Sequence, residues 1–151
     1  MTRIDEEAFT LELPGDWEGI GGEPGTLVYH EIGGRGMVTV VPLSVRPLFA
    51  IADKMRLMSD YIDHRAKYET GQAPTLVHTE PVIEERDGAI EGLWDGVDTL
   101  FGRMQRHKTL LVDDVLVDFC FSAPSFDDES FGLQAAEVLG GASLATHGEE
   151  S

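Results

Sequence analysis

The stretch from residue 76 to residue 122 constrains the fold most, because four β-rich runs follow one another there with almost no chain between them. Apolar and polar residues alternate along these runs, which is typical of strands with one buried face. Connections of two or three residues join neighbouring strands in antiparallel order. The segment therefore predicts a meander whose strands span residues 76–85, 89–97, 101–112 and 115–122.

The N-terminal part predicts three more strands. Phe9 to Leu13 alternates apolar and polar residues, as expected for a half-buried strand. The runs Thr26–Ile32 and Gly36–Leu43 flank a glycine-rich connection and predict a hairpin. Gly33 and Gly34 can adopt positive φ without a Cβ penalty, which suits the turn of this hairpin.

Two segments change to the three-four spacing of amphipathic helices. The first runs from Leu48 to Ala66, and the second follows a Ser125–Asp128 capping box and ends at Gly140-Gly141. We therefore expect an α+β domain over residues 1–145, an antiparallel sheet of about six or seven strands covered by two main helices. Residues 146–151 are expected to form a flexible tail.

The charge balance excludes several partners. Asp and Glu number 28 against 11 Lys and Arg, a net charge of −17, and the sequence has no basic stripe for nucleic acid. Anionic membranes are disfavoured by the same charge, and no run approaches the ~20 apolar residues of a membrane span. The N-terminus lacks signal-peptide features and Cys120 is the only cysteine, so a cytoplasmic location is expected.

No catalytic or metal-binding motif stands out. The histidines form no His-x-x-x-His pair, and His30 and His78 would meet only if their strands paired. Cys120 alternates with the apolar face of its strand and is expected to be packed and inert. The acidic turns lack calcium-loop spacing. The sequence therefore predicts no enzyme, no cofactor and no metal.

A corner near the N-terminus carries a family resemblance. The motif F-x-L-x-L-P-G-D-W places Pro14, Gly15, Asp16 and Trp17 after the first predicted strand, and F-S-A-P-S-F (Phe121–Phe126) precedes the last helix. With the order of elements, these features resemble the PsbP-like superfamily, which includes Mog-type and DcrB proteins and the Eag-type chaperones of secreted effectors. The resemblance implies a PsbP-like sandwich and a non-enzymatic role. Length, acidity and the missing signal sequence agree best with the Eag-type branch, which shields apolar helices.

The leading functional hypothesis is therefore a protein-binding module, a chaperone or adaptor for an apolar segment of a partner such as a secreted effector. Its surface would be one sheet face, although the same residues would also suit a core beneath a helix. A homodimer is left open. The candidate residues are Val28, Val38, Val40, Leu93, Val97 and Met104.

Two alternatives come from other classes of function. One is a small-molecule-binding protein or enzyme with a pocket between helix and sheet, where Glu91, Asp95 and His107 would have to converge. The other is a structural subunit whose acidic surface complements a basic partner. Trp17 is interpreted as architecture, a ring folded over the end of the core with its N–H bonded at the rim.

Overall fold

The computed structural model describes residues 1–124 and 128–145, which hold eleven strands and two helices. The predicted Ser125 capping residue and the tail 146–151 lie outside the described residues. The helices are α1 (Ile51–Gln72) and α2 (Asp128–Gly140). The strands are β1 (Thr2–Asp5), β2 (Phe9–Leu13), β3 (Trp17–Ile20), β4 (Leu27–Glu31), β5 (Met37–Ser44), β6 (Leu76–His78), β7 (Val82–Arg86), β8 (Ala89–Asp98), β9 (Arg103–Val112), β10 (Val115–Pro124) and β11 (Ala142–Leu144).

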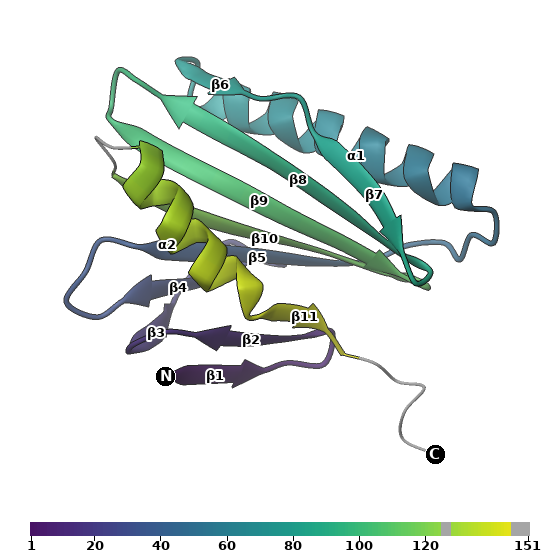
Figure 1. Cartoon of the computed structure of the whole chain (residues 1–151), viewed down its shortest axis with the longest axis horizontal. Coiled ribbons are helices and arrows are strands. Elements are labelled where there is room, and N and C mark those ends of the chain that lie inside the picture. Colours follow the sequence, from purple (N-terminus) through teal and green to yellow (C-terminus); the bar gives the residue numbers. More distant parts are fainter. Residues whose placement is uncertain (125–127, 146–151) are drawn as a thin grey trace.

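Eight of the strands form one antiparallel sheet in the order β3-β4-β5-β10-β9-β8-β6, with β7 also paired to β8 (Figure 1). The predicted hairpin (β4–β5) and the meander through β8, β9 and β10 are both confirmed. At the β7–β8 turn, Asp87 and Gly88 both have positive φ, 53° and 85°, as a tight Asp-Gly hairpin requires. A second sheet, β1-β2-β11, lies beside the large one.

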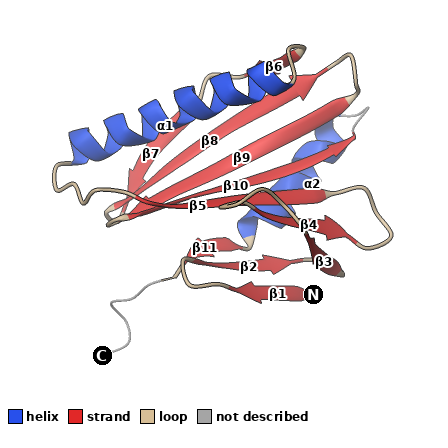
Figure 2. Ribbon diagram, turned by 180° about the vertical axis from the view of Figure 1, so that it is seen from behind, coloured by secondary structure: helices blue, strands red, loops and turns tan. Residues whose placement is uncertain are grey.

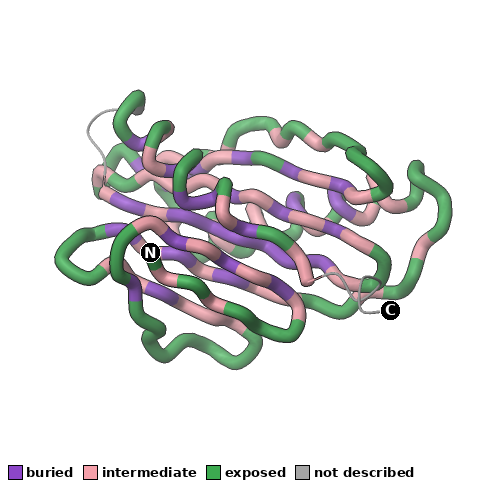
Figure 3. Tube along the Cα trace, turned by 60° about the horizontal axis from the view of Figure 1, so that its bottom comes forward, coloured by how far each residue is buried: buried purple, intermediate pink, exposed green. Residues whose placement is uncertain are grey.

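The two helices pack on opposite faces of the large sheet (Figures 1 and 2). Along β10, Val117, Phe119 and Phe121 belong to the core shared with α2 and β2. The preceding residue, Leu116, points to the other face and packs in a smaller core with Met58 and Ile62 of α1. Figure 3 shows the resulting alternation of burial along the strands, which follows from the period of two. The expected α+β class, with two helices packed against a large antiparallel sheet, is confirmed.

Helix α1 and the first strand of the expected meander differ most from the sequence expectation. Helix α1 begins at Ile51 rather than residue 48 and ends at Gln72 rather than residue 66, because polar contacts hold its last turns against the sheet. The run expected as one strand over 76–85 divides into β6 and β7, since Pro81 lies between them and donates no backbone bond. In the described part of the chain, neither helix is long and apolar enough to cross a membrane.

Three short strands were not predicted: β1, β3 and β11. They span only three or four residues each, too few for alternation to be recognised. Strand β11 follows the last helix, where no further element was expected, and pairs with β2.

The Pro14–Trp17 corner has the architectural role expected of it. Gly15 turns the chain at φ +83°, and Trp17 is 6% exposed within the larger core. Its indole Nε1 donates to the carbonyl of Pro14 at 2.7 Å. The Thr2 hydroxyl of β1 donates to the Gly15 carbonyl and accepts from the Trp17 backbone N–H, so β1 fastens the corner. Strand pairing resumes at Trp17, because β3 begins there.

Replacing Trp17 by alanine should lower the free energy of unfolding by about 3–5 kcal/mol, because it empties a buried ring site. Urea unfolding monitored by circular dichroism measures the loss. Ile20→Ala is the matched control, since Ile20 lies on the same strand but is 41% exposed, and it should change stability by no more than about 0.5 kcal/mol. Equal effects of the two substitutions would contradict the corner's role.

Candidate functional site

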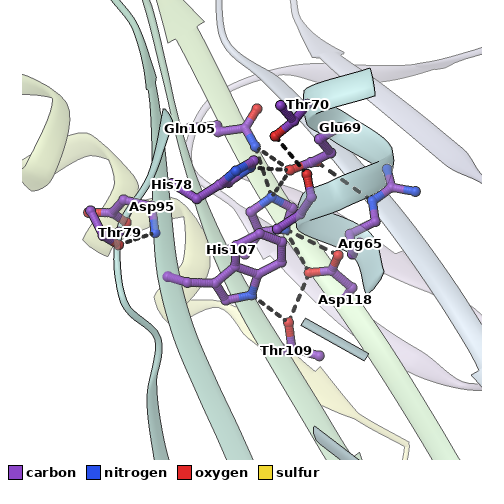
Figure 4. A network of polar contacts seen from close by, with 12 residues as sticks. Arg65, Glu69, Thr70, His78, Thr79, Asp95, Gln105, His107, Thr109 and Asp118 are labelled. Atoms are coloured by element: carbon purple, nitrogen blue, oxygen red, sulfur yellow. Dashed lines mark hydrogen bonds and ion pairs between the residues drawn. The ribbon is translucent and has the colours of Figure 1, made fainter. Parts of the chain in front are cut away.

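A cluster of polar side chains lies between α1 and the large sheet, inside what would otherwise be an apolar layer (Figure 4). His107 and Thr109 of β9 are fully buried, and Asp118 of β10 is 1% exposed. The alternation of β9 and β10 turns all three toward α1, where they meet Glu69 and Tyr61. Buried polar groups in such numbers require mutual hydrogen bonds. We call this cluster the polar network; its members are Tyr61, Glu69, His78, Trp94, Gln105, His107, Thr109 and Asp118.

His107 occupies the centre of the polar network. Its Nδ1 lies 3.0 and 3.1 Å from the two carboxylate oxygens of Asp118, and its Nε2 lies 3.2 Å from Oε1 of Glu69. The ring of Trp94 stacks on the imidazole with centroids 3.6 Å apart and planes 8° from parallel. The imidazole is therefore held in one plane with a carboxylate at each nitrogen.

Asp118 receives hydrogen bonds from three sides. The hydroxyl of Tyr61 donates to Oδ2 at 3.0 Å, and that of Thr109 donates to Oδ1 at 3.0 Å. The Thr109 hydroxyl in turn accepts from Trp94 Nε1 at 3.2 Å. These bonds satisfy a carboxylate that has lost its water, which would otherwise cost several kcal/mol.

Glu69 is the network's contact to the outside, with its side chain 12% exposed. Its Oε1 lies 2.9 Å from His78 Nε2 and accepts from the Gln105 amide at 2.8 Å. Burial opposes ionisation of this carboxyl, but hydrogen bonds from His107 and His78 and the nearby charge of Arg65 outweigh it and lower its pKa to about 2. Glu69 is thus a buried carboxylate that stays charged.

The pKa of the His107 imidazole is shifted upward, in the opposite direction to that of Glu69. Burial alone would lower the pKa of His107, but Asp118 and Cys120 outweigh burial and hold the pKa well above its ordinary 6.5. Cys120 lies directly across from His107 in the β9–β10 register and is buried. Burial raises the pKa of its thiol, more than His107 lowers it. The expectation of a packed cysteine on the face opposite Phe119 is confirmed.

A cavity of about 280 Å³ adjoins the network between α1 and the edge of β8. The chain between β6 and β7 forms its rim, where the Thr79 N–H donates to the Asp95 carbonyl and the Thr79 hydroxyl accepts from the Asp95 N–H. His78 and Trp94 line its inner wall. It is lined by Ser59, Ile62, Asp63, Ala66, His78, Thr79, Glu80, Pro81 and Trp94.

The other side of the same strands carries part of the predicted binding surface. Leu93 of β8 is 38% exposed, and Val97 and Met104 are half-buried on the same face. Val77 of β6 and Val82 of β7 are paired with Val97 and Leu93, so they share that face and are 69% and 55% exposed. We call Val77, Val82, Leu93, Val97 and Met104 the outer sheet face; Figure 1 shows that α2 crosses β9 and β10 and leaves β6, β7 and β8 uncovered.

The remaining predicted surface residues lie elsewhere. Val38 and Val40 are fully buried in the larger core, because α2 and β2 cover their side of the sheet. Val28 pairs with Thr39 and alternates with the core residue Tyr29, so it faces the opposite side of the sheet from Val38. The six candidates therefore do not form one surface, and Val38 and Val40 are corrected to core.

Two expected convergences are also corrected. Glu91 and Asp95 point to the outer side of β8, whereas His107 points toward α1, so these three groups do not converge. Asp95 instead forms a two-point ion pair with Arg106. His30 and His78 do not meet, because β4 and β6 are separated by four strands of the sheet; His30 contacts Glu18 and His78 contacts Glu69.

The polar network itself was not predicted. The sequence contained one signal: Asp118 and Thr109 interrupt apolar strands. If both faces of the sheet are covered by helices, such positions are buried. A charge in the middle of a central strand requires buried partners. The sequence does not reveal that those partners come from α1.

Comparison with known proteins supports the fold. No protein-family model and no curated protein sequence matches the chain. The solution structure of cyanobacterial PsbP (CyanoP) from Synechocystis sp. PCC 6803 is similar with a TM-score of 0.72 and 13% identity, over 95% of this chain and 92% of that one. A crystal structure from Bacteroides thetaiotaomicron has a TM-score of 0.50 and 11% identity over 95% of this chain, which spans about half (47%) of that protein. The chain therefore has a PsbP-like fold, as its corner indicated.

The polar network should stabilise the fold most between about pH 4.5 and pH 6.5. Glu69 has a pKa lowered from 4.5 to about 2, so its contribution is complete above pH 4.5 and is lost as the pH falls toward 2. His107 has a raised pKa, so its contribution is complete below pH 6.5 and is lost as the pH rises through the folded value.

The measurement is the free energy of unfolding in urea across pH for the wild type and Glu69→Gln, in buffer that contains a chelator. The difference between them should shrink by roughly 3 kcal/mol between pH 5 and pH 2. Glu18→Gln removes the carboxylate of an exposed His–Glu pair and is the control. Its free energy of unfolding should follow the same pH dependence as that of the wild type. Parallel profiles for wild type and Glu69→Gln would refute the assigned role.

Proposed function

We propose that the chain is a non-enzymatic protein-binding module, and that the outer sheet face receives an amphipathic segment of its partner. The observation that carries the proposal is an apolar surface on β6, β7 and β8 that α2 leaves uncovered, with Met104 of β9 at its border with the larger core. Aligned apolar side chains left open on a sheet mark interaction surfaces. A chaperone or adaptor that shields an apolar segment, such as a helix of a secreted effector, is the form of this activity that we favour.

The outer sheet face has two apolar parts. Val77, Val97 and Met104 lie opposite one another on three neighbouring strands and form a transverse row. Val82 and Leu93 form a second pair, four residues away along β8. The parts are about 13 Å apart along the strand. That distance corresponds to about 2.4 turns of helix, and apolar side chains seven or eight positions apart on an amphipathic helix, about 10.5–12 Å along its axis, would come within reach of both.

The charges of this face select the partner's flanks. Between the two apolar parts, Asp95 and Arg106 neutralise each other. Beyond Leu93, Glu91 lies opposite Glu84, which is paired with Arg86, and the whole chain carries a net charge of −17. An apolar segment flanked by lysine or arginine would therefore be attracted, and an acidic one would be repelled.

The test uses a synthetic helical peptide with leucines seven positions apart and lysines at both ends. Titration into isotope-labelled protein should shift amide signals of β6, β7 and β8, and Leu93→Asp should weaken binding at least about 10-fold because it places a charge in the apolar contact. Ile32→Asp is the control, since Ile32 is 54% exposed in the β4–β5 turn. Equal loss in both variants, or shifts confined to other elements, would disprove the surface.

A second candidate function, a small-molecule-binding protein, is favoured by the 280 Å³ cavity beside His78. It combines apolar walls from Ile62 and Trp94 with the polar groups of Ser59 and Asp63. Its volume lies just below the range typical of ligand sites, roughly 300–1,000 Å³, so a small ligand is required.

Thermal shift across a panel of metabolites examines this candidate. A ligand of the cavity should raise the melting temperature of the wild type, and Ala66→Phe should abolish that rise because its ring would fill the space beside Trp94. Ala52→Phe, at an exposed position near the start of the same helix, is the control. A ligand that stabilises all three proteins equally binds elsewhere.

A further inference from the structure

Three side chains from different elements direct ligand atoms at one point beneath α1. They are Glu69 from the last turns of α1, His107 from β9 and Cys120 from β10, and one ligand atom of each lies within 4.8 Å of the others. His78 of β6 is a neighbouring donor: its Nε2 lies 2.9 Å from the Glu69 oxygen that also faces His107, although it is outside the group of three ligand atoms that lie within 4.8 Å of one another. Figure 4 shows both imidazoles turned toward Glu69.

We propose that Glu69, His78, His107 and Cys120 form a binding site for one divalent transition-metal ion, with a donor set suited to Zn²⁺. One thiolate, two imidazoles and one carboxylate are the ligand types that zinc takes in proteins, while calcium and magnesium prefer oxygen alone. Ligand atoms around tetrahedral zinc are roughly 3.3–3.8 Å apart. The 3.2 Å between Glu69 Oε1 and His107 Nε2 is close to this spacing, and a side-chain rotation of His78 would be needed to bring its imidazole to the fourth position.

The surroundings of His107 prepare it as a ligand. Its Nδ1 donates to Asp118, and its Nε2 faces Glu69 and Cys120, where a metal ion would replace the Nε2 proton that is shared with Glu69. Asp118 is fixed by Tyr61 and Thr109, and Trp94 holds the ring plane. A carboxylate behind a metal-binding histidine sets its tautomer and strengthens its donor atom, and this arrangement recurs in zinc sites.

The charges and the access route also fit a metal ion. Zn²⁺ and the nearby Arg65 would face the carboxylates of Glu69 and Asp118 and the Cys120 thiolate, so the buried charges balance. Gln105 donates to Glu69 Oε1 and lies 3.0 Å from His107 Nε2, and its flexible amide would swing aside. Access is from the side of Glu69 and His78, which are 12% and 11% exposed, whereas His107 is sealed.

The ion would connect the end of α1 to three strands of the sheet. Glu69 lies in the last turns of the helix, and the other ligands lie on β6, β9 and β10. A metal that binds the folded chain and not the unfolded one adds its binding free energy to stability. The ion would therefore strengthen the attachment of a helix that contacts the sheet through the polar network and a small apolar cluster.

The experiment uses the full chain, stripped with a chelator and kept reduced. Zn²⁺ is titrated against a chromophoric chelator, and Co²⁺ is added separately as a spectroscopic probe. We expect one equivalent of bound zinc, a higher melting temperature with zinc, and for Co²⁺ the thiolate charge-transfer band and strong visible bands of a tetrahedral site.

Two ligand variants and one matched control decide the outcome. Cys120→Ser keeps the shape of the side chain and should remove the charge-transfer band and weaken zinc binding by more than about 100-fold; Glu69→Gln should weaken it by at least about 10-fold. Melting curves without metal verify that each variant folds. His30→Ala removes the imidazole of the His30–Glu18 pair and should leave affinity unchanged.

The proposal is overturned if the wild type binds no stoichiometric zinc. It is also overturned if the cobalt spectrum is the same in Cys120→Ser, or if His30→Ala loses as much affinity as Glu69→Gln. In each of these cases the polar network is an ion-pair cluster without a metal. These readouts do not involve the outer sheet face, so their failure would leave the proposed binding function standing.

Discussion

The buried carboxylate of Asp118 is the constraint on which much of the structure depends. It sits in the middle of β10 and is 1% exposed, so its charge is stable only if hydrogen-bond donors replace the lost water. Those donors come from β9 through His107 and Thr109, and from α1 through Tyr61. One side chain thereby fixes the β9–β10 register and the position of α1. A slip of one residue would turn Asp118 into the larger core and expose its apolar neighbours to polar groups.

The same strand explains why the protein has two separate cores. Six consecutive residues of β10, from Leu116 to Phe121, are buried, which is possible only when both faces of the strand are covered. The odd-numbered residues Val117, Phe119 and Phe121 meet α2 and the small sheet, and form the larger, wholly apolar cluster. The even-numbered ones meet α1, where Leu116 is followed by Asp118 and Cys120. The α1 side is thus less apolar, and polar contacts take a larger share in holding that helix.

Local periodicity was sufficient to predict the elements with long, regular patterns. The meander, the β4–β5 hairpin and both helices come from such patterns, and the Pro14–Trp17 corner indicated the PsbP-like fold that the structural comparison supports. The short strands β1, β3 and β11 exist because partners elsewhere accept their backbone bonds, and no local pattern reports that. The predicted surface residues show the same limit: Val38 and Leu93 share a face of the sheet, but α2 and β2 cover Val38 and leave Leu93 partly exposed.

The polar network was out of reach for a more specific reason. Glu69 and His107 are 38 residues apart, and Asp118 is a further 11 along the chain, so only the tertiary fold brings them together. Each residue alone has an ordinary explanation as a helix-surface or strand-edge polar group. What the sequence does contain is a local conflict, a charge within the apolar run Val115–Phe121. Conflicts of this kind between local pattern and burial are where functional or structural polar sites are expected.

Strands β8 and β9 carry both proposed sites, and the pleat keeps them chemically independent. Trp94 and His107 point toward α1, whereas Leu93, Asp95 and Arg106, their sequence neighbours, point to the outer sheet face. The fold fixes which face of the sheet each position occupies, but not which residue type stands there. This is consistent with a TM-score of 0.72 to CyanoP at only 13% sequence identity. In this chain the inner face of these strands is therefore polar at His107 and Thr109, while Leu93 and Val97 keep the other face apolar.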